Sequence, residues 1–129
     1  VSIDVKKVNG KYAVFINAGQ EPTGLDPILW AKKVAELGAG EILITSIDKE
    51  GMMEGYDLEL IRLVSDAVDI PVIASGGVGN LEHLAQGIKQ GHASAVAASS
   101  IFHFTDQNVI KARSFLKEAG IDIRYKVDY

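Results

Sequence analysis

The stretch that decides the fold is residues 70–80, IPVIASGGVGN, in which a β-branched apolar run stops at a serine and two glycines. The segment PVIAS has the continuous apolar character of a strand that is buried on both faces, which is typical of parallel sheets. The two glycines allow the backbone to approach another group closely, and Asn80 favours the start of a helix. We therefore predict a strand, a glycine-rich turn and a helix, in that order.

The same succession of strand, loop and helix recurs along the whole chain. Strands are predicted at 1–5, 41–47, 71–75 and 93–99, and helices at 27–37, 58–68, 81–90 and about 107–119. Asn9-Gly10 predicts a hairpin after the first strand, and the segment 121–129 is predicted to be strand-like or irregular. Repeats of this length are typical of βα units. Four units with parallel strands form half of a (βα)8 TIM barrel, or alternatively a small open sheet.

Composition excludes several classes of function. The chain has 129 residues, 47% of them hydrophobic, which suffices for one packed domain. A net charge of −4 provides no basic surface for nucleic acid, and no apolar run reaches the roughly 18 residues of a membrane helix. The absence of cysteine fits a cytoplasmic protein, and the histidines lack metal-ligand spacing, so we expect no metal. Because the sequence opens on Val1 inside an apparent strand, we expect a fragment or a designed chain.

Every predicted strand ends in small, polar or acidic residues, at the edge where parallel sheets carry their functional loops. These residues are Asp4, then Thr45, Ser46 and Asp48, then Ser75, Gly76 and Gly77, and finally Ala98, Ser99 and Ser100. The main-chain N–H groups of SGG and AASS, next to helix N-termini, favour an anion. We therefore predict a phosphate site there. The alternative is that Gly76 and Gly77 only form a tight turn.

Four carboxylates lie at or near the ends of predicted strands. Asp4 follows an apolar run and is a candidate general acid or base, although a structural aspartate would also fit. Asp48 and Glu50 either line the mouth of the site or are present because the DKEG segment forms a turn, which Asp and Gly favour. Glu41 lies at the start of a strand, where a solvated charge is the ordinary interpretation.

Five segments together point to one family: VSIDVK (1–6), GAGEILITSID (38–48), EGYD (54–57), PVIASGGVG (71–79) and SAVAASSIFHF (94–104). Over nearly its whole length the chain resembles the C-terminal half of the cyclase subunits of imidazole glycerol phosphate synthase, the HisF family of histidine biosynthesis. The resemblance implies that residues 1–129 supply strands five to eight of a complete barrel. The family cyclase is a lyase that needs no cofactor and converts PRFAR, with ammonia from a HisH-type glutaminase subunit, to imidazole glycerol phosphate and AICAR.

The resemblance also implies roles for individual residues. Asp4 matches the second of two acid–base aspartates, the first of which lies in the other half. The phosphate site of this half is matched by Ser75, Gly76, Gly77, Ala98 and Ser99, and substrate contacts by Thr45, Asp48 and Gly51. Glu41 matches a charged residue of the gate through which ammonia enters the barrel.

Departures from the family pattern keep two alternatives open. The loop reads DKEGMM where DRDGT is usual, so that Glu50 and Met52 replace an aspartate and a threonine, and Ala18 replaces a common serine. The first alternative is a paralogue that delivers ammonia for sugar amidation in surface-polysaccharide synthesis. The second is an inactive half-barrel that serves as an assembly unit. We expect the isolated chain to be inactive and to pair with an N-terminal half-barrel or with itself, because open sheet edges associate.

Overall fold

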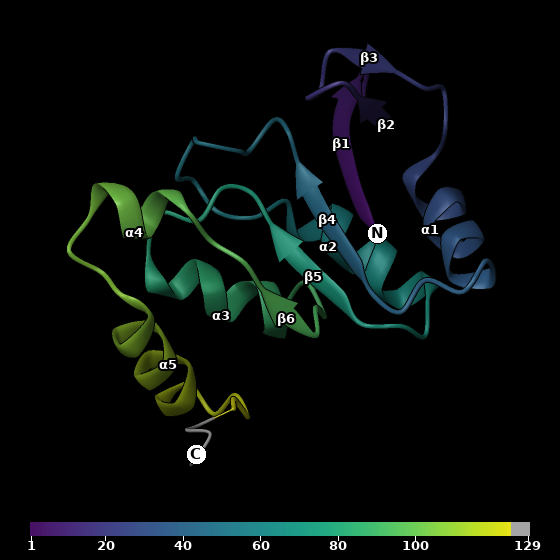
Figure 1. Ribbon diagram of the computed structural model, residues 1–129. Helices are drawn as coiled ribbons and strands as arrows, with labels where there is room; N and C mark the ends of the chain where they lie inside the picture. The colour runs from purple at the N-terminus through teal and green to yellow at the C-terminus, as the bar shows by residue number, and fades with distance from the viewer. Residues whose placement is uncertain (125–129) are drawn as a thin grey trace.

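The computed structural model describes residues 1–124 and shows one six-stranded sheet with helices packed against it (Figure 1). The strands are β1 (Ser2–Val8), β2 (Lys11–Ile16), β3 (Glu21–Pro22), β4 (Ile42–Ser46), β5 (Val72–Ser75) and β6 (Ala95–Val96). The helices are α1 (Pro27–Glu36), α2 (Leu58–Ala67), α3 (Leu81–Lys89), α4 (Ser100–Phe104) and α5 (Val109–Glu118). No helix within residues 1–124 is long and apolar enough to span a bilayer.

The strands that begin the βα units run parallel, which confirms the predicted α/β class. In the sheet order β3-β2-β1-β4-β5-β6, β1 pairs with β4, β4 with β5, and β5 with β6, all in parallel. Ile44 lies at the centre of this sheet, opposite Ile3 on one side and Ala74 on the other. The antiparallel part is confined to the β1–β2–β3 hairpin segment.

The two faces of the parallel strands differ in character. Side chains alternate between the faces of a strand, and Ile3, Ile44 and Val72 are almost completely buried in one core. The apolar stripes of α1, α2 and α3, including Val34, Leu60, Ile61, Val64, Leu84 and Ala85, belong to the same core. The opposite face carries half-buried residues, among them Asp4, Leu43, Thr45, Ile73 and Ser75. The helices thus cover one face, and the candidate polar residues lie on the other.

The predicted helix starts are confirmed by side-chain caps. Asp26 Oδ1 accepts hydrogen bonds from the amides of Ile28 and Leu29 at 2.8 and 3.0 Å, with Pro27 at the first helical position. At the next two helices, Asp57 and Asn80 each accept one amide hydrogen bond, from Leu60 and His83 respectively. Each cap satisfies an amide that has no partner inside the helix.

The hairpin after the first strand has a consequence for Asp4. Asn9 and Gly10 both have positive φ, 51° and 78°, as a two-residue type I′ turn requires. The turn pairs β2 with β1 from Asp4 to Val8, so the first strand continues beyond the predicted residue 5. Asp4 therefore lies inside β1 (Ser2–Val8), and not at its C-terminal end, where the sequence analysis had placed it. The same pairing with β2 covers part of β1, one of the sheet edges through which we expected the chain to associate.

Two further differences concern the end of the chain. The fourth parallel strand covers only Ala95–Val96 of the predicted 93–99, because its ladder with β5 is limited to the pairs Ile73–Ala95 and Ala74–Val96. The short helix α4, which residues 97–99 separate from β6, was not predicted, and its N-cap Ser99 makes no side-chain capping hydrogen bond. Residues 121–124 form no regular element, and the remainder of the predicted tail, 125–129, lies outside the described residues.

Candidate functional site

A small pocket lies where the loops after β5 and β6 meet. Figure 1 shows the loops after β4 and β5 and the helix α4 gathered at one end of the sheet. The pocket has a volume of about 130 Å³ and is lined by Glu50, Ser75, Gly76, Gly77, Val78, Ala97, Ala98, Ser99 and Ser100. It therefore brings together the five residues that the sequence assigned to one subsite from two separate motifs.

The glycine pair is needed for packing between loops. Gly76 and Gly77 have φ of 96° and 106°, which side chains rarely adopt. A Cβ at Gly76 would lie 2.9 Å from the carbonyl oxygen of Ser46, and one at Gly77 would overlap the carbonyl oxygen of Gly55. The Gly55 N–H donates to Gly77 O at 2.7 Å. The sequence predicted that the backbone of the glycine pair approaches another group closely. In the structure it lies against Ser46, at the end of β4, and against Gly55 in the following loop, neither of which the sequence indicated.

Tyr56 joins this same loop to the opposite wall of the pocket. Its hydroxyl donates a hydrogen bond of 2.6 Å to the carbonyl oxygen of Ala97. The side chain is 6% exposed, and its ring faces Gly87 of α3. Burial raises the pKa of the Tyr56 hydroxyl above its ordinary range. Sequence analysis did not select Tyr56, although it lies in the EGYD segment.

The raised pKa of Tyr56 predicts a loss of stability in alkali. The unfolded chain releases the tyrosine proton above pH of about 10, whereas the folded chain retains it. The contribution of Tyr56 is therefore complete below pH 10 and falls above it, by about 1.4 kcal/mol per pH unit. We expect urea unfolding at pH 10 and 11 to show a smaller alkaline loss for Tyr56→Phe than for the wild type. Parallel losses in the two proteins would contradict the assignment.

Asp4 lies in line with the pocket across the sheet. The register places Asp4 opposite Thr45, and Thr45 opposite Ser75, so the three residues form one row. Paired side chains in a row point to the same face, and strands are about 4.8 Å apart, so Asp4 is about 10 Å from Ser75. Asp4 is half-buried on that face. A carboxylate and the glycine-rich pocket thus share one face of the sheet.

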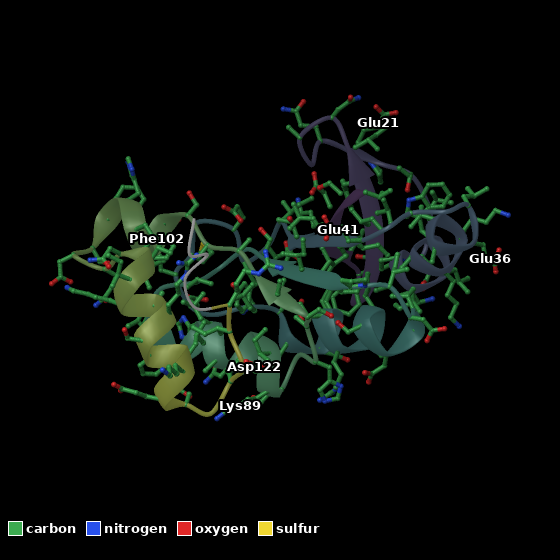
Figure 2. The ribbon with its side chains drawn as sticks, turned by 60° about the horizontal axis from the view of Figure 1, so that its bottom comes forward. Glu21, Glu36, Glu41, Lys89, Phe102 and Asp122 are labelled. Carbon is green, nitrogen blue, oxygen red and sulfur yellow. The ribbon has the colours of Figure 1, made fainter. Side chains whose placement is uncertain are left out.

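The structure separates the other predicted residues from the pocket. The Asp48 carboxylate oxygen Oδ2 accepts a hydrogen bond of 2.8 Å from the Lys7 N–H, which connects the loop after β4 to β1. Gly51 is exposed at the tip of this loop, with φ of 76°. Glu41 precedes β4 at the opposite end of the strands, and Figure 2 shows it far from Phe102 on α4. Neither Asp48 nor Gly51 lines the pocket.

Glu50, Val78 and Ser100 complete the lining of the pocket. Glu50 Oε2 would lie 3.2 Å from a Cβ at Gly76, so its carboxylate closes one side of the pocket. The sequence marked Glu50 only as a carboxylate near the mouth. Ser100 is the last residue of the AASS motif, at which the sequence analysis predicted the phosphate site, whereas Val78 was not selected. No lysine or arginine lines the pocket among residues 1–124.

Parallel strands with a pocket at their carboxyl ends define an α/β protein of the barrel or open-sheet class. Residues 1–108 match the family described as "Histidine biosynthesis protein", a family of TIM-barrel proteins, and the chain belongs to this family. It is 54% identical over 124 residues to the imidazole glycerol phosphate synthase subunit HisF of Chlorobaculum tepidum. The match covers 96% of this chain and 49% of the relative, so the chain spans about half of that protein's length.

One solved structure supports the fold alone. The crystal structure of the Amycolatopsis orientalis BexX/CysO complex contains a chain that superposes with a TM-score of 0.57 at 19% identity. The match covers 78% of this chain and 44% of that chain. At this identity the similarity supports the arrangement of strands and helices and carries no statement about the site.

Proposed function

We propose that residues 1–129 form the C-terminal half, strands five to eight, of a cyclase subunit of imidazole glycerol phosphate synthase. The complete barrel would act as a lyase that converts PRFAR and ammonia to imidazole glycerol phosphate and AICAR. The observation that carries the proposal is the 54% identity to a HisF subunit together with the convergence of SGG and AASS on one pocket. This level of identity favours the cyclase over ammonia delivery for sugar amidation and over an inactive assembly unit.

In this proposal the pocket binds one phosphate group of the substrate. The lining offers the hydroxyls of Ser75, Ser99 and Ser100 and the main chain of two glycines, groups that suit phosphate oxygens. Because Glu50 is negative and no basic side chain lines the described pocket, the anion would be held by main-chain and hydroxyl donors. Thr45, Asp48 and Gly51 would contact other parts of the substrate, Asp48 after exchange of its bond to the Lys7 amide.

Asp4 would move protons during ring closure. It lies on the same face as the pocket, within reach of a substrate that extends about 10 Å from its phosphate. A half-buried carboxylate in this position can accept a proton and return it, as general acid–base catalysis requires. The second aspartate of the pair would come from the N-terminal half.

The opposite end of the barrel would receive ammonia. Glu41 precedes β4 at that end, so a glutaminase subunit of the HisH type would bind there. The partner on the sheet edges would be the N-terminal half-barrel, since β6 has no second neighbour within residues 1–124. Self-association of the chain would use the same edge.

Turnover after recombination of the halves tests the proposal. We expect the isolated chain to show no ammonia-dependent formation of imidazole glycerol phosphate from PRFAR, since only one aspartate of the pair is present. Addition of an N-terminal half-barrel should restore the product, and a half-barrel without its own aspartate serves as the control. Product from the 129-residue chain alone, or none from the recombined halves, would refute the proposal.

A further inference from the structure

Two consecutive residues in the loop after β4 reach opposite walls of the pocket. The Gly55 N–H donates to Gly77 O at 2.7 Å, in the wall that follows β5. The Tyr56 hydroxyl donates to Ala97 O at 2.6 Å, in the wall that follows β6. These two bonds link both walls through a single peptide unit, although the walls belong to different βα units.

The side chain of Tyr56 is tightly packed. Its side chain is almost fully buried, and a Cβ at Gly87 would lie 2.9 Å from the edge of its ring, so the ring lies tightly against α3. The same Cβ would lie 3.0 Å from Val96 in β6. Tyr56 itself does not line the pocket. It therefore acts on the pocket only through the strand end that it holds.

We infer that Tyr56 is a positioning residue, whose hydroxyl fixes the spacing between the Gly76-Gly77 wall and the Ala98-Ser99 wall of the anion pocket. This inference rests on the proposed anion site. A pocket of about 130 Å³ is small, so a shift of one wall changes the distance of its donors from a bound anion. Hydrogen bonds weaken steeply with distance and angle, and the preorganised spacing therefore determines affinity.

Phosphate binding by two tyrosine variants tests the inference. Tyr56→Phe removes the hydroxyl and keeps the ring against Gly87, whereas Tyr12→Phe is the matched control. The Tyr12 hydroxyl likewise donates a hydrogen bond, here to the carboxylate of Asp57 at 2.9 Å and not to the main chain, and Tyr12 does not line the pocket. The probe is inorganic phosphate, titrated into the full chain while the amide resonances of Gly76, Gly77 and Ser99 are followed by NMR.

We expect the phosphate Kd of Tyr56→Phe to rise about tenfold and that of Tyr12→Phe to stay within about twofold of the wild type. In the complete cyclase, Tyr56→Phe should raise KM for PRFAR with little change in kcat. A purely structural role would lower kcat by reducing the folded fraction and would leave KM unchanged. Equal phosphate affinity in the wild type and Tyr56→Phe would overturn the inference alone. Failure of the wild type to bind phosphate would overturn the proposed site as well.

Gly87→Ala provides a second variant should Tyr56→Phe fail to fold. The added methyl group displaces the Tyr56 ring and leaves the hydroxyl present, so the bond to Ala97 is strained without being deleted. We expect phosphate affinity to fall in this variant also. A folded Gly87→Ala chain with wild-type affinity would contradict the positioning role.

Discussion

Replacement of Asp4 by asparagine is expected to lower kcat of the complete cyclase by about 10²- to 10⁴-fold, the usual contribution of a general acid or base. Asparagine has nearly the same shape and still accepts hydrogen bonds through its amide oxygen, but it cannot take up and release a proton at neutral pH. Asp4 is held between Thr45 and Phe15 by the parallel and antiparallel ladders of β1. The substitution should therefore leave both the fold and the substrate KM nearly unchanged.

The matched control for this variant is Asp66→Asn. Asp66 is an exposed aspartate of α2 that pairs with His92, at 2.8 Å between Oδ1 and Nδ1, and it does not line the pocket. Asp66→Asn therefore makes the same chemical change away from the site. Steady-state kinetics of both variants, with circular dichroism to verify folding, make the measurement. A loss of activity in Asp4→Asn of less than about tenfold, or an equal loss in Asp66→Asn, would assign Asp4 a structural role.

The fold could be predicted where local chemistry agreed with the tertiary structure. The predicted starts of two helices, at residues 27 and 58, agree with the structure. In the sequence, Asp26 precedes Pro27 and Asp57 precedes an apolar stripe. The apolar run 72–75 is a central strand of the parallel sheet, as its lack of polar alternation indicated. These signals are contained in a few neighbouring residues, and a single sequence is sufficient to identify them.

The features that could not be predicted depend on contacts between distant segments. The extent of β1 past Asp4 follows from its pairing with β2, and the two-residue length of β6 follows from its limited pairing with β5. The bond from Tyr56 to Ala97 joins residues that are 41 positions apart, and nothing local marks either one. The sequence correctly indicated that the SGG glycines allow another group to come close. It did not indicate that this group is the main chain of Gly55, in the loop after β4.

Substitution of Gly77 by alanine is expected to destabilise the chain by about 3–5 kcal/mol. Two costs add. The first is backbone strain of about 1–3 kcal/mol, because φ is 106° and a side chain disfavours this region. The second is steric, since the new Cβ would overlap the carbonyl oxygen of Gly55 and would approach Lys49 Cβ to 3.0 Å. Backbone atoms cannot move aside as the end of a flexible side chain can.

Gly38→Ala separates these two costs. Gly38 has a similar φ of 98°, but no atom lies within 4 Å of the position of an added Cβ. Urea unfolding of both variants therefore measures strain alone at Gly38 and strain plus overlap at Gly77. We expect Gly77→Ala to lose at least about 2 kcal/mol more than Gly38→Ala. Equal losses would mean that the loop after β4 yields to the methyl group, so that the two walls are not held at a fixed spacing.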